Sequence, residues 1–222
     1  MINCPTSEYI STLKREYYTS KTGKRALALI NKYNPDIYLE LHCYRKENYN
    51  KLIDTERRYK DGVPPLIELE NKVLIGSISP LIRITFFDKY DFSFMLEMPC
   101  NPSTDSMGTY LDVLDMVIGS KNRFEILKKL EYKYPSAVKK ASEYFFEFSD
   151  NFVRLFKEIQ WELMKDNDLR NFKTNRDAIM KKASQMNISI TSKQAELILQ
   201  AFLLYKDHNS DFLPDSSWAS VG

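Results

Sequence analysis

The chain has 222 residues, of which 43% are hydrophobic and 28% are charged, values that are ordinary for a globular protein built on one large domain. Its formal net charge of +2 lacks the basic excess of nucleic-acid binding proteins, so we expect no nucleic-acid partner. No apolar run approaches the ~20 residues that cross a bilayer, and the first residues lack the apolar core of a signal peptide. No membrane partner is therefore expected, and the expected location is the cytoplasm.

The cysteines and glycines exclude several kinds of site. The three cysteines are Cys4, Cys43 and Cys100. Their odd number and wide spacing argue against a disulfide framework or a zinc ribbon, and each is interpreted as a small core residue. The 6 glycines form neither of the Gly-rich motifs that hold nucleotide phosphates.

The first hundred residues predict the element order of an α/β unit. The expected order is a helix at 8–18, a break at Thr22-Gly23, a helix at 24–33, and strands at 36–43, 72–78 and 92–98. Pro35 ends the second helix, because proline disfavours helical backbone in the residue before it. A polar, irregular segment at 44–71 follows the first strand, at a position where binding loops are usually found.

From residue 105 onward the hydrophobic periodicity is helical. Helices are expected at 109–118, 121–134, 136–165, 174–186 and 192–206, with Thr191 as the N-cap of the last. The third carries an aromatic stripe that we interpret as core: Ala141, Tyr144, Phe145, Phe148, Phe152, Phe156, Ile159 and Leu163. The expected organisation is an α/β core at 1–104 with a mixed sheet flanked by helices, an all-helical region at 105–206 that packs on or extends it, and a flexible tail at 207–222.

Polar side chains gather at the ends of two predicted strands. Because side chains alternate along a strand, Glu40 and His42 share one face, and a carboxylate two residues from a histidine can hold the imidazole in one tautomer. Glu97 lies near the end of the strand at 92–98, and ligands in open α/β sheets sit at the carboxyl ends of strands. His208, the second histidine, falls in the predicted tail.

These residues support two readings. In the first, the site is a zinc hydrolase in which His42 binds the metal, Glu40 orients His42, and Glu97 is the general base. Arg83 and Arg45 are then the candidates that hold a substrate carboxylate. In the second, His42 is a hydrogen-bonded core histidine, and Glu40 and Glu97 are ion-pair partners. A Cys43 nucleophile is disfavoured, because alternation points Cys43 to the opposite face.

Two segments resemble the zinc carboxypeptidase superfamily, and most of all its succinylglutamate desuccinylase/aspartoacylase branch. The run from Asn34 to His42 is similar to the strand that carries a zinc histidine, and Phe94 to Pro99 is similar to the strand that carries the catalytic glutamate. A narrower likeness, from Tyr9 to about Phe148, is to an uncharacterised archaeal family related to those enzymes. The segments that carry it are Tyr9–Leu13, Glu40–Tyr44, Gly62–Leu66 and Ile75–Pro80.

The resemblance implies a zinc carboxypeptidase-like fold, a zinc cofactor, and hydrolysis of an amide bond near a carboxylate in a small molecule or peptide. It implies that His42 is a zinc ligand and Glu97 the general base, with Glu40 in the place of the usual aspartate. Arg83 lies in the region where the desuccinylase branch holds its substrate.

One departure from the superfamily pattern leaves alternatives open. The superfamily takes its first two zinc ligands from a His-x-x-Glu motif, and no histidine precedes His42 here. The ligand-bearing segment is expected upstream of Met1, or a partner chain supplies it, or the protein is a relative that binds a ligand without hydrolysis. The predicted function is thus a hydrolase module, incomplete as given, and the alternative is a non-catalytic ligand- or protein-binding relative. The sequence does not indicate how many copies of the chain associate.

Overall fold

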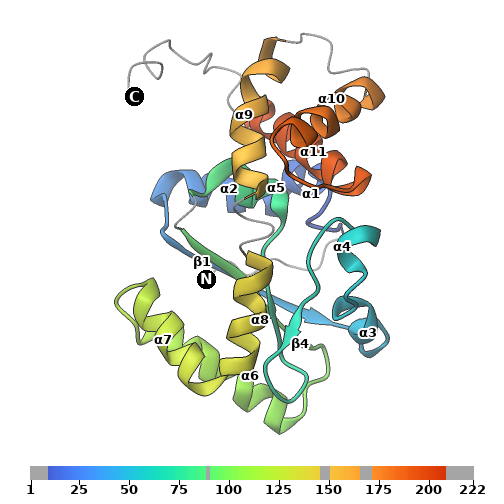
Figure 1. The fold of residues 1–222 in the computed structure, drawn as a ribbon. Coiled ribbons are helices and arrows are strands. Elements are labelled where there is room, and N and C mark those ends of the chain that lie inside the picture. The colour runs from blue at the N-terminus through green and yellow to red at the C-terminus, as the bar shows by residue number, and fades with distance from the viewer. Residues whose placement is uncertain (1–9, 89–90, 146–150, 166–171, 209–222) are drawn as a thin grey trace.

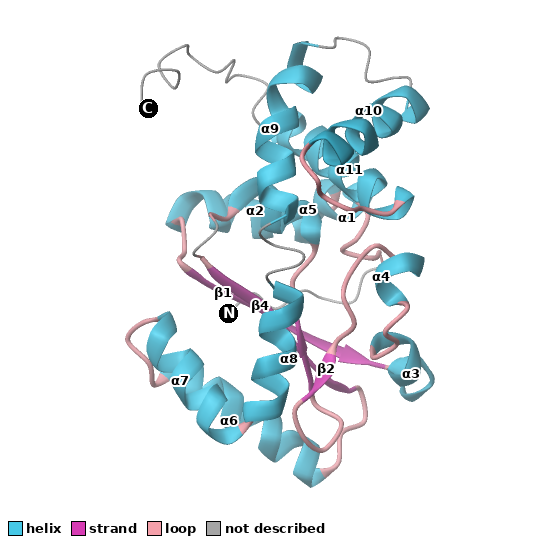
Figure 2. Cartoon of the chain, in the orientation of Figure 1, coloured by secondary structure: helices cyan, strands magenta, loops and turns pink. Residues whose placement is uncertain are grey.

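A four-stranded mixed sheet lies between two groups of helices (Figure 1). The computed structural model describes residues 10–88, 91–145, 151–165 and 172–208. In the orientation of Figure 2, α6 and α7 lie below the strands and α8 rises from them to the level of the sheet, while α1, α2, α5 and α9 to α11 lie above the strands. The prediction of an α/β protein with a mixed sheet flanked by helices is confirmed.

The strands are β1 (Ile37–Tyr44), β2 (Ile67–Glu68), β3 (Leu74–Gly76) and β4 (Phe92–Pro99), in the spatial order β1-β4-β3-β2. β1 and β4 are parallel, whereas β3 is antiparallel to both β4 and β2. The strands predicted at 36–43 and 92–98 are therefore confirmed. The short strand β2 lies within the segment predicted to be irregular.

The β2–β3 hairpin turns through Asn71 and Lys72, whose φ angles are 51° and 64°. The N–H of Val73 donates to the carbonyl of Glu70 at 2.9 Å. Two successive positive φ angles within such a hydrogen bond make a type I′ turn, which fits the twist of a hairpin. The usual sequence signal for this turn is Asn-Gly, and its absence here explains why the hairpin was not predicted.

The N-terminal helices differ from the prediction. α1 (Arg15–Thr19) begins later than the helix expected at 8–18, and α2 (Lys21–Tyr33) runs through the break expected at Thr22-Gly23. Residues 8 and 9 lie outside the described residues. Ser20 caps α2, because its hydroxyl accepts the N–H of Gly23 at 3.2 Å. Gly23 suits this tight corner, since a Cβ there would lie 2.1 Å from the carbonyl oxygen of Tyr17.

Among the remaining helices, those from residue 104 onward follow the predicted periodicity closely, whereas the four between residues 46 and 86 were not predicted. The remaining helices are η1 (Lys46–Asn48), α3 (Tyr49–Leu52), α4 (Arg57–Lys60), α5 (Pro80–Phe86), α6 (Thr104–Ile118), α7 (Arg123–Lys133), α8 (Pro135–Phe145), α9 (Asn151–Lys165), α10 (Phe172–Gln185) and α11 (Ser192–His208). The helix predicted at 136–165 corresponds to α8 and α9, and residues 146–150 between them lie outside the described residues. Thr191 caps α11 as predicted, in a reciprocal pair of hydrogen bonds with Gln194.

Each face of the sheet is covered by its own hydrophobic core. Side chains of α1, α2, α5 and α11 cover the face that carries Met95 and Tyr44, and side chains of α6, α7 and α8 cover the face that carries Phe94 and Leu96. A third core lies among α5 and α9 to α11. The buried side chains Phe152, Phe156 and Ile159 of this core confirm the central part of the predicted aromatic stripe. Phe148 lies outside the described residues, and the side chains of Phe145 and Leu163 are not described.

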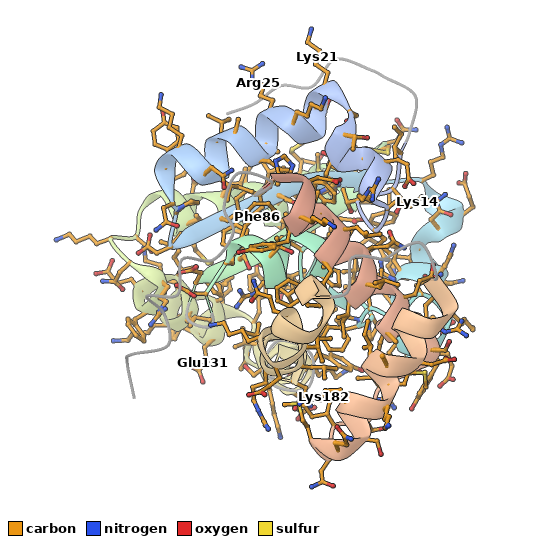
Figure 3. All side chains as sticks on the ribbon, turned by 90° about the horizontal axis from the view of Figure 1, so that it is seen from above. Lys14, Lys21, Arg25, Phe86, Glu131 and Lys182 are labelled. Carbon is orange, nitrogen blue, oxygen red and sulfur yellow. A yellow bond between two sulfur atoms is a disulfide. The ribbon has the colours of Figure 1, made fainter. Side chains whose placement is uncertain are left out.

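His208 does not lie in a tail. It ends α11, and its ring lies 5.9 Å from the ring of Phe86, between centroids. Seen from above in Figure 3, Phe86 lies among the helices, whereas Lys21 and Arg25 of α2 point outward. The prediction of a tail from residue 207 is therefore wrong at Asp207 and His208, which continue the helical hydrogen bonding. The rest of that segment lies outside the described residues.

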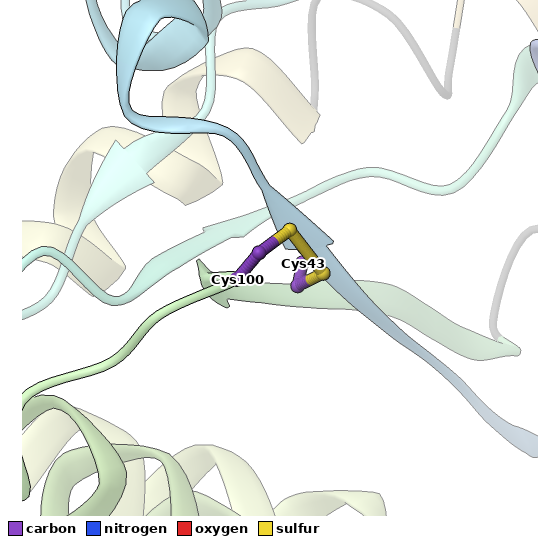
Figure 4. The surroundings of a disulfide bond; sticks show 2 residues. All are labelled: Cys43 and Cys100. Atoms are coloured by element: carbon purple, nitrogen blue, oxygen red, sulfur yellow. A yellow bond between two sulfur atoms is a disulfide. The ribbon is translucent and has the colours of Figure 1, made fainter.

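Cys43 and Cys100 form a disulfide at the ends of β1 and β4 (Figure 4). Their Cα atoms are 4.9 Å apart, and both residues are exposed. The prediction that these cysteines are small core residues is wrong for this pair. The parallel pairing of two strands distant in sequence brings them together, and spacing alone does not reveal that pairing. Cys4 lies outside the described residues.

Because both cysteine residues are exposed, we expect a thiol reductant to open this disulfide without unfolding the protein. Iodoacetamide should then label Cys43 and Cys100 together in native buffer, and it should label neither residue when the reductant is omitted. Peptide mass spectrometry measures both results. Labelling of either cysteine in protein that has not been reduced would show that the bond is absent.

Candidate functional site

The parallel pairing of β1 and β4 brings two of the predicted site residues side by side. His42 and Glu97 are direct partners in the register of the two strands. Both strands run in the same direction, so their carboxyl ends lie at the same end of the sheet. Ligand sites in α/β proteins are usually found at this end. The structure thus brings together Glu40, His42 and Glu97.

Glu40 holds the ring of His42. Its Oε2 lies 3.0 Å from His42 Nε2, and its Oε1 accepts a hydrogen bond from the hydroxyl of Tyr38 at 3.1 Å. Burial lowers the pKa of His42, but the hydrogen bond and charge of Glu40 and the charge of Glu97 together raise it above its usual value. The imidazole is therefore fixed in orientation through one nitrogen, while Nδ1 has no partner among the described residues.

Glu97 is a buried carboxylate with little to compensate its burial. Its exposed fraction is 9%. Burial raises its pKa, although the nearby positive charge of Arg57 and that of His42, when protonated, oppose the shift. A carboxylate whose burial is only partly compensated by nearby positive charge destabilises the folded state, which is the pattern expected of a residue kept for function.

Two tyrosines complete the surroundings of Glu40. Tyr38 precedes Glu40 on the same strand face, so alternation could have identified it from the sequence. Tyr18 of α1 is only 2% exposed, and its phenol pKa is raised well above the usual value by burial and by the charge of Glu40. Tyr18 comes from a helix that packs over this face, and no local sequence signal links it to Glu40.

The two predicted substrate-binding arginines lie in different places. Arg45 is exposed and directly follows β1, where its carbonyl accepts the N–H of Asn48. Arg83 is buried on α5, and its Nη1 donates to the carbonyl of Asp88 at 2.8 Å. It lines an apolar cavity of about 370 Å³ together with Ser93. Ser93 and Glu97 are about 13 Å apart along β4, so the structure does not bring Arg83 to the Glu40–His42 pair.

Arg57 is a cation near Glu97 that the sequence did not suggest. It lies on α4, its Nη1 donates to the carbonyl of Pro64 at 3.1 Å, and its Nε lies 3.8 Å from Asp61. Its charge reaches Glu97 through space. It comes from the long segment after β1, which was predicted to carry binding residues and in which only Arg45 was identified as a candidate.

Glu40, His42 and Glu97 carry donor atoms of the kinds that bind zinc. Among the residues that the structure describes, no group of three His, Cys, Asp or Glu side chains is arranged to hold an ion. His42 and Glu97 could supply two ligands, whereas structural and catalytic zinc sites use at least three protein ligands. His208 is engaged with Phe86 on α5. The side chains of Glu40, His42 and Glu97 are therefore of the types that bind zinc, but they supply too few ligands for a complete zinc site.

A family model described as an uncharacterized protein conserved in archaea (DUF2119) matches residues 1–150. The chain belongs to this family. The DUF2119 match includes both site strands, β1 and β4, together with the helices α6 to α8. The predicted membership of an archaeal family is confirmed.

One relative of this DUF2119 protein is the uncharacterized protein MJ0501 of Methanocaldococcus jannaschii. The two are 45% identical over 139 residues, which is 63% of this chain and 66% of MJ0501. The chain thus matches just under two thirds of that relative's length. No solved structure matches the chain. None of the helices in the described ranges is long and apolar enough to cross a membrane.

Proposed function

We propose that Glu40, His42 and Glu97 form the chain's part of a zinc site in a hydrolase that cleaves an amide bond near a carboxylate. The observation that supports this most is the 3.0 Å contact between Glu40 Oε2 and His42 Nε2, with Glu97 as the direct neighbour of His42. Histidines that bind metal almost always donate their other ring N–H to a carboxylate or carbonyl. When Nε2 carries the proton to Glu40, Nδ1 presents the lone pair that a metal needs.

Each residue has a distinct role in this proposal. His42 binds the metal through Nδ1, Glu40 fixes the ring, and Tyr38 fixes Glu40. Glu97 is the general base, because burial raises its pKa toward the range in which a carboxylate accepts and releases a proton efficiently. Zinc in such a site lowers the pKa of water to about 7. A zinc carboxypeptidase-like origin of the fold is part of this proposal and rests on the resemblance of the two site strands.

The carboxylate of the substrate needs a cation close to the carboxyl ends of β1 and β4, where the proposed zinc site lies. Arg45 follows directly from the end of β1, two residues beyond Cys43, and is exposed. Arg57 acts on Glu97 from α4. We place the substrate carboxylate with these two arginines, since a guanidinium can hold a carboxylate with two parallel hydrogen bonds. Arg83, at the other end of β4, is kept as a candidate only for a substrate long enough to reach it.

Metal analysis of the purified full chain tests the proposal. After loading with zinc and dialysis, we expect at least about half an equivalent of zinc per chain, which is the ratio of one ion shared by two chains. His42→Ala should lose the zinc. His208→Ala is the matched control, because it removes the chain's other imidazole and should retain the zinc.

Two outcomes would contradict the proposal. The first is a zinc content well below half an equivalent in the unaltered protein. The second is zinc that His42→Ala leaves in place, or that His208→Ala removes. Either outcome would favour a DUF2119 protein that binds a ligand or another protein without metal-dependent hydrolysis.

A further inference from the structure

β1 is an edge strand with one side unpaired. In the sheet order β1-β4-β3-β2, its neighbour is β4, and no other strand among the described residues pairs with it. It is 8 residues long, from Ile37 to Tyr44. Exposed edge strands are usually short, or carry lysine, proline or a bulge that prevents pairing with another chain. β1 contains no lysine or proline and is as long as the interior strand β4.

The backbone groups that face the free edge can be assigned. The carbonyl of Asp36 accepts the N–H of Phe92 at 2.8 Å, and the carbonyl of Tyr44 accepts the N–H of Cys100 at 2.9 Å. Backbone groups of alternate residues point to the same side of a strand, so the even-numbered residues bond to β4. The N–H and C=O groups of the odd-numbered residues therefore point away from the sheet: Ile37, Leu39, Leu41 and Cys43.

The free edge also presents an exposed apolar side chain. Leu41, near the middle of the outward-facing set, is 42% exposed. On the other face of the strand the His42 side chain is 31% exposed, against 12% for Glu40. A second strand laid along this edge would cover Leu41 and would reach His42.

A second copy of β1 fits this edge in one register. When two identical edges pair antiparallel about a two-fold axis, residues whose backbone N–H and C=O groups point to the free edge must lie opposite each other. In β1 these are the odd-numbered residues. If Leu41 opposes Leu41 of the second copy, Glu40 opposes His42 of the second copy, and His42 opposes its Glu40. A shift that opposes Leu39 to Leu41 would place the two Glu40 carboxylates against each other. A shift that opposes Leu41 to Cys43 would place the two imidazoles against each other.

Pairing chemistry selects among these registers. Opposite-charge or donor–acceptor pairs across two strands stabilise a sheet, and like charges directly opposite each other destabilise it. Only the Leu41–Leu41 register gives both copies a carboxylate opposite an imidazole, with Cβ atoms about 5 Å apart. It gathers two Glu40 carboxylates and two His42 rings on one face of a continuous sheet.

We propose that β1 pairs antiparallel with β1 of a second copy of this chain, in the register that opposes Leu41 to Leu41. The two half-sites then combine, and two imidazoles with flanking carboxylates provide the ligand number that one chain lacks. The metal in this shared site rests on the proposed function. The strand pairing does not, because it follows from the free edge and from the Glu40–His42 complementarity.

The oligomeric state of the full chain tests the pairing, measured by sedimentation equilibrium. We expect a dimer. Leu41→Lys should raise the dimer dissociation constant by more than about tenfold, because the two lysines would face each other across the axis. Ile118→Lys is the matched control: Ile118 is also apolar and is 80% exposed, but it lies on α6. This control should remain dimeric, and circular dichroism should show that both variants are folded.

Cysteine cross-linking tests the proposed register, in which Leu41 lies opposite Leu41 of the second copy. Leu41→Cys should form a disulfide between two chains under mild oxidation, because directly opposed residues of paired strands have Cα atoms within disulfide range. Mass spectrometry should identify the link between the two introduced cysteines. Ile118→Cys should not link. A monomeric unaltered protein, or a dimer that Leu41→Lys and Ile118→Lys affect equally, would overturn the proposal.

Zinc content separates this proposal from the proposed function. One zinc per two chains, lost in Leu41→Lys although His42 is intact, supports both. A Leu41-dependent dimer without zinc supports the strand pairing and contradicts the proposed function. Zinc that stays bound to monomeric Leu41→Lys protein supports the proposed function and overturns the shared site.

Discussion

Glu97→Gln is expected to stabilise the metal-free protein, by about 1–3 kcal/mol in the free energy of unfolding. The Glu97 carboxylate is buried, and its burial raises its pKa in spite of the nearby charges of His42 and Arg57. Glutamine has nearly the same shape without the charge, so the variant removes the cost of burying an ion that the fold compensates only in part. Residues that destabilise a protein in this way are commonly kept for function.

The gain should depend on pH. Burial raises the pKa of Glu97 in the folded protein above its value in the unfolded chain. Below the pKa of Glu97 in the unfolded chain, the carboxyl group is neutral in both states and its burial costs nothing. As the pH rises through the pKa of Glu97 in the folded protein, the unaltered protein loses stability. The stabilisation by Glu97→Gln should therefore be full near about pH 8 and small near about pH 4. Urea unfolding of chelator-treated protein at the two pH values measures it.

Glu40→Gln is the matched control for this prediction. The Glu40 carboxylate accepts one hydrogen bond from Tyr38 and contacts His42, so its replacement should destabilise the protein, by about 1–3 kcal/mol. The two substitutions thus have opposite expected signs, although both convert a glutamate of the same cluster into glutamine. A loss of stability in Glu97→Gln as large as in Glu40→Gln would show that Glu97 is a structural ion-pair partner.

Phe202→Ala is expected to cost about 3–5 kcal/mol of unfolding free energy. Phe202 of α11 is 3% exposed, and its ring stacks on that of Phe156 of α9 with centroids 4.3 Å apart. The substitution would leave a cavity in the core that joins α9 to α11. Met180→Ala on α10 is the control, because Met180 is 36% exposed and should cost about 0.5 kcal/mol or less.

Phe202→Ala also tests whether the C-terminal helices belong to the same cooperative unit as the site. Leu197 and Leu204 of α11 are buried in the core that covers the His42 face of the sheet, while Phe202 lies in the other core. α11 therefore connects the two cores. Denaturant unfolding followed by circular dichroism and by tyrosine fluorescence should give one coincident transition, shifted by the substitution. Two separate transitions would show that α9 to α11 fold independently of the sheet.

Sequence reasoning predicted the elements that depend on local patterns. β1 and β4 were predicted because each is an apolar run bounded by turn residues, and strand alternation correctly placed Glu40 and His42 on one face. The helices from α6 onward were predicted from their periodicity. The carboxyl ends of β1 and β4 meet as expected because the two strands are parallel.

The features that were missed depend on contacts between distant segments. The Cys43–Cys100 disulfide requires the register of two strands, with a sequence separation of 57 residues. Tyr18 and Arg57 reach the site from α1 and α4, and neither has a local pattern that marks it. The α1–α2 corner depends on the close approach of Gly23 to Tyr17, which a single glycine in the sequence does not specify.

The most direct test of a metal site at His42 is the position of the metal itself. Crystals of zinc-loaded protein, measured at the zinc absorption edge, should show an anomalous peak about 2.1 Å from His42 Nδ1. Glu40 should still contact Nε2 of the same ring. An anomalous peak bound only by other residues, or a His42 ring without a peak in zinc-loaded crystals, would contradict the site.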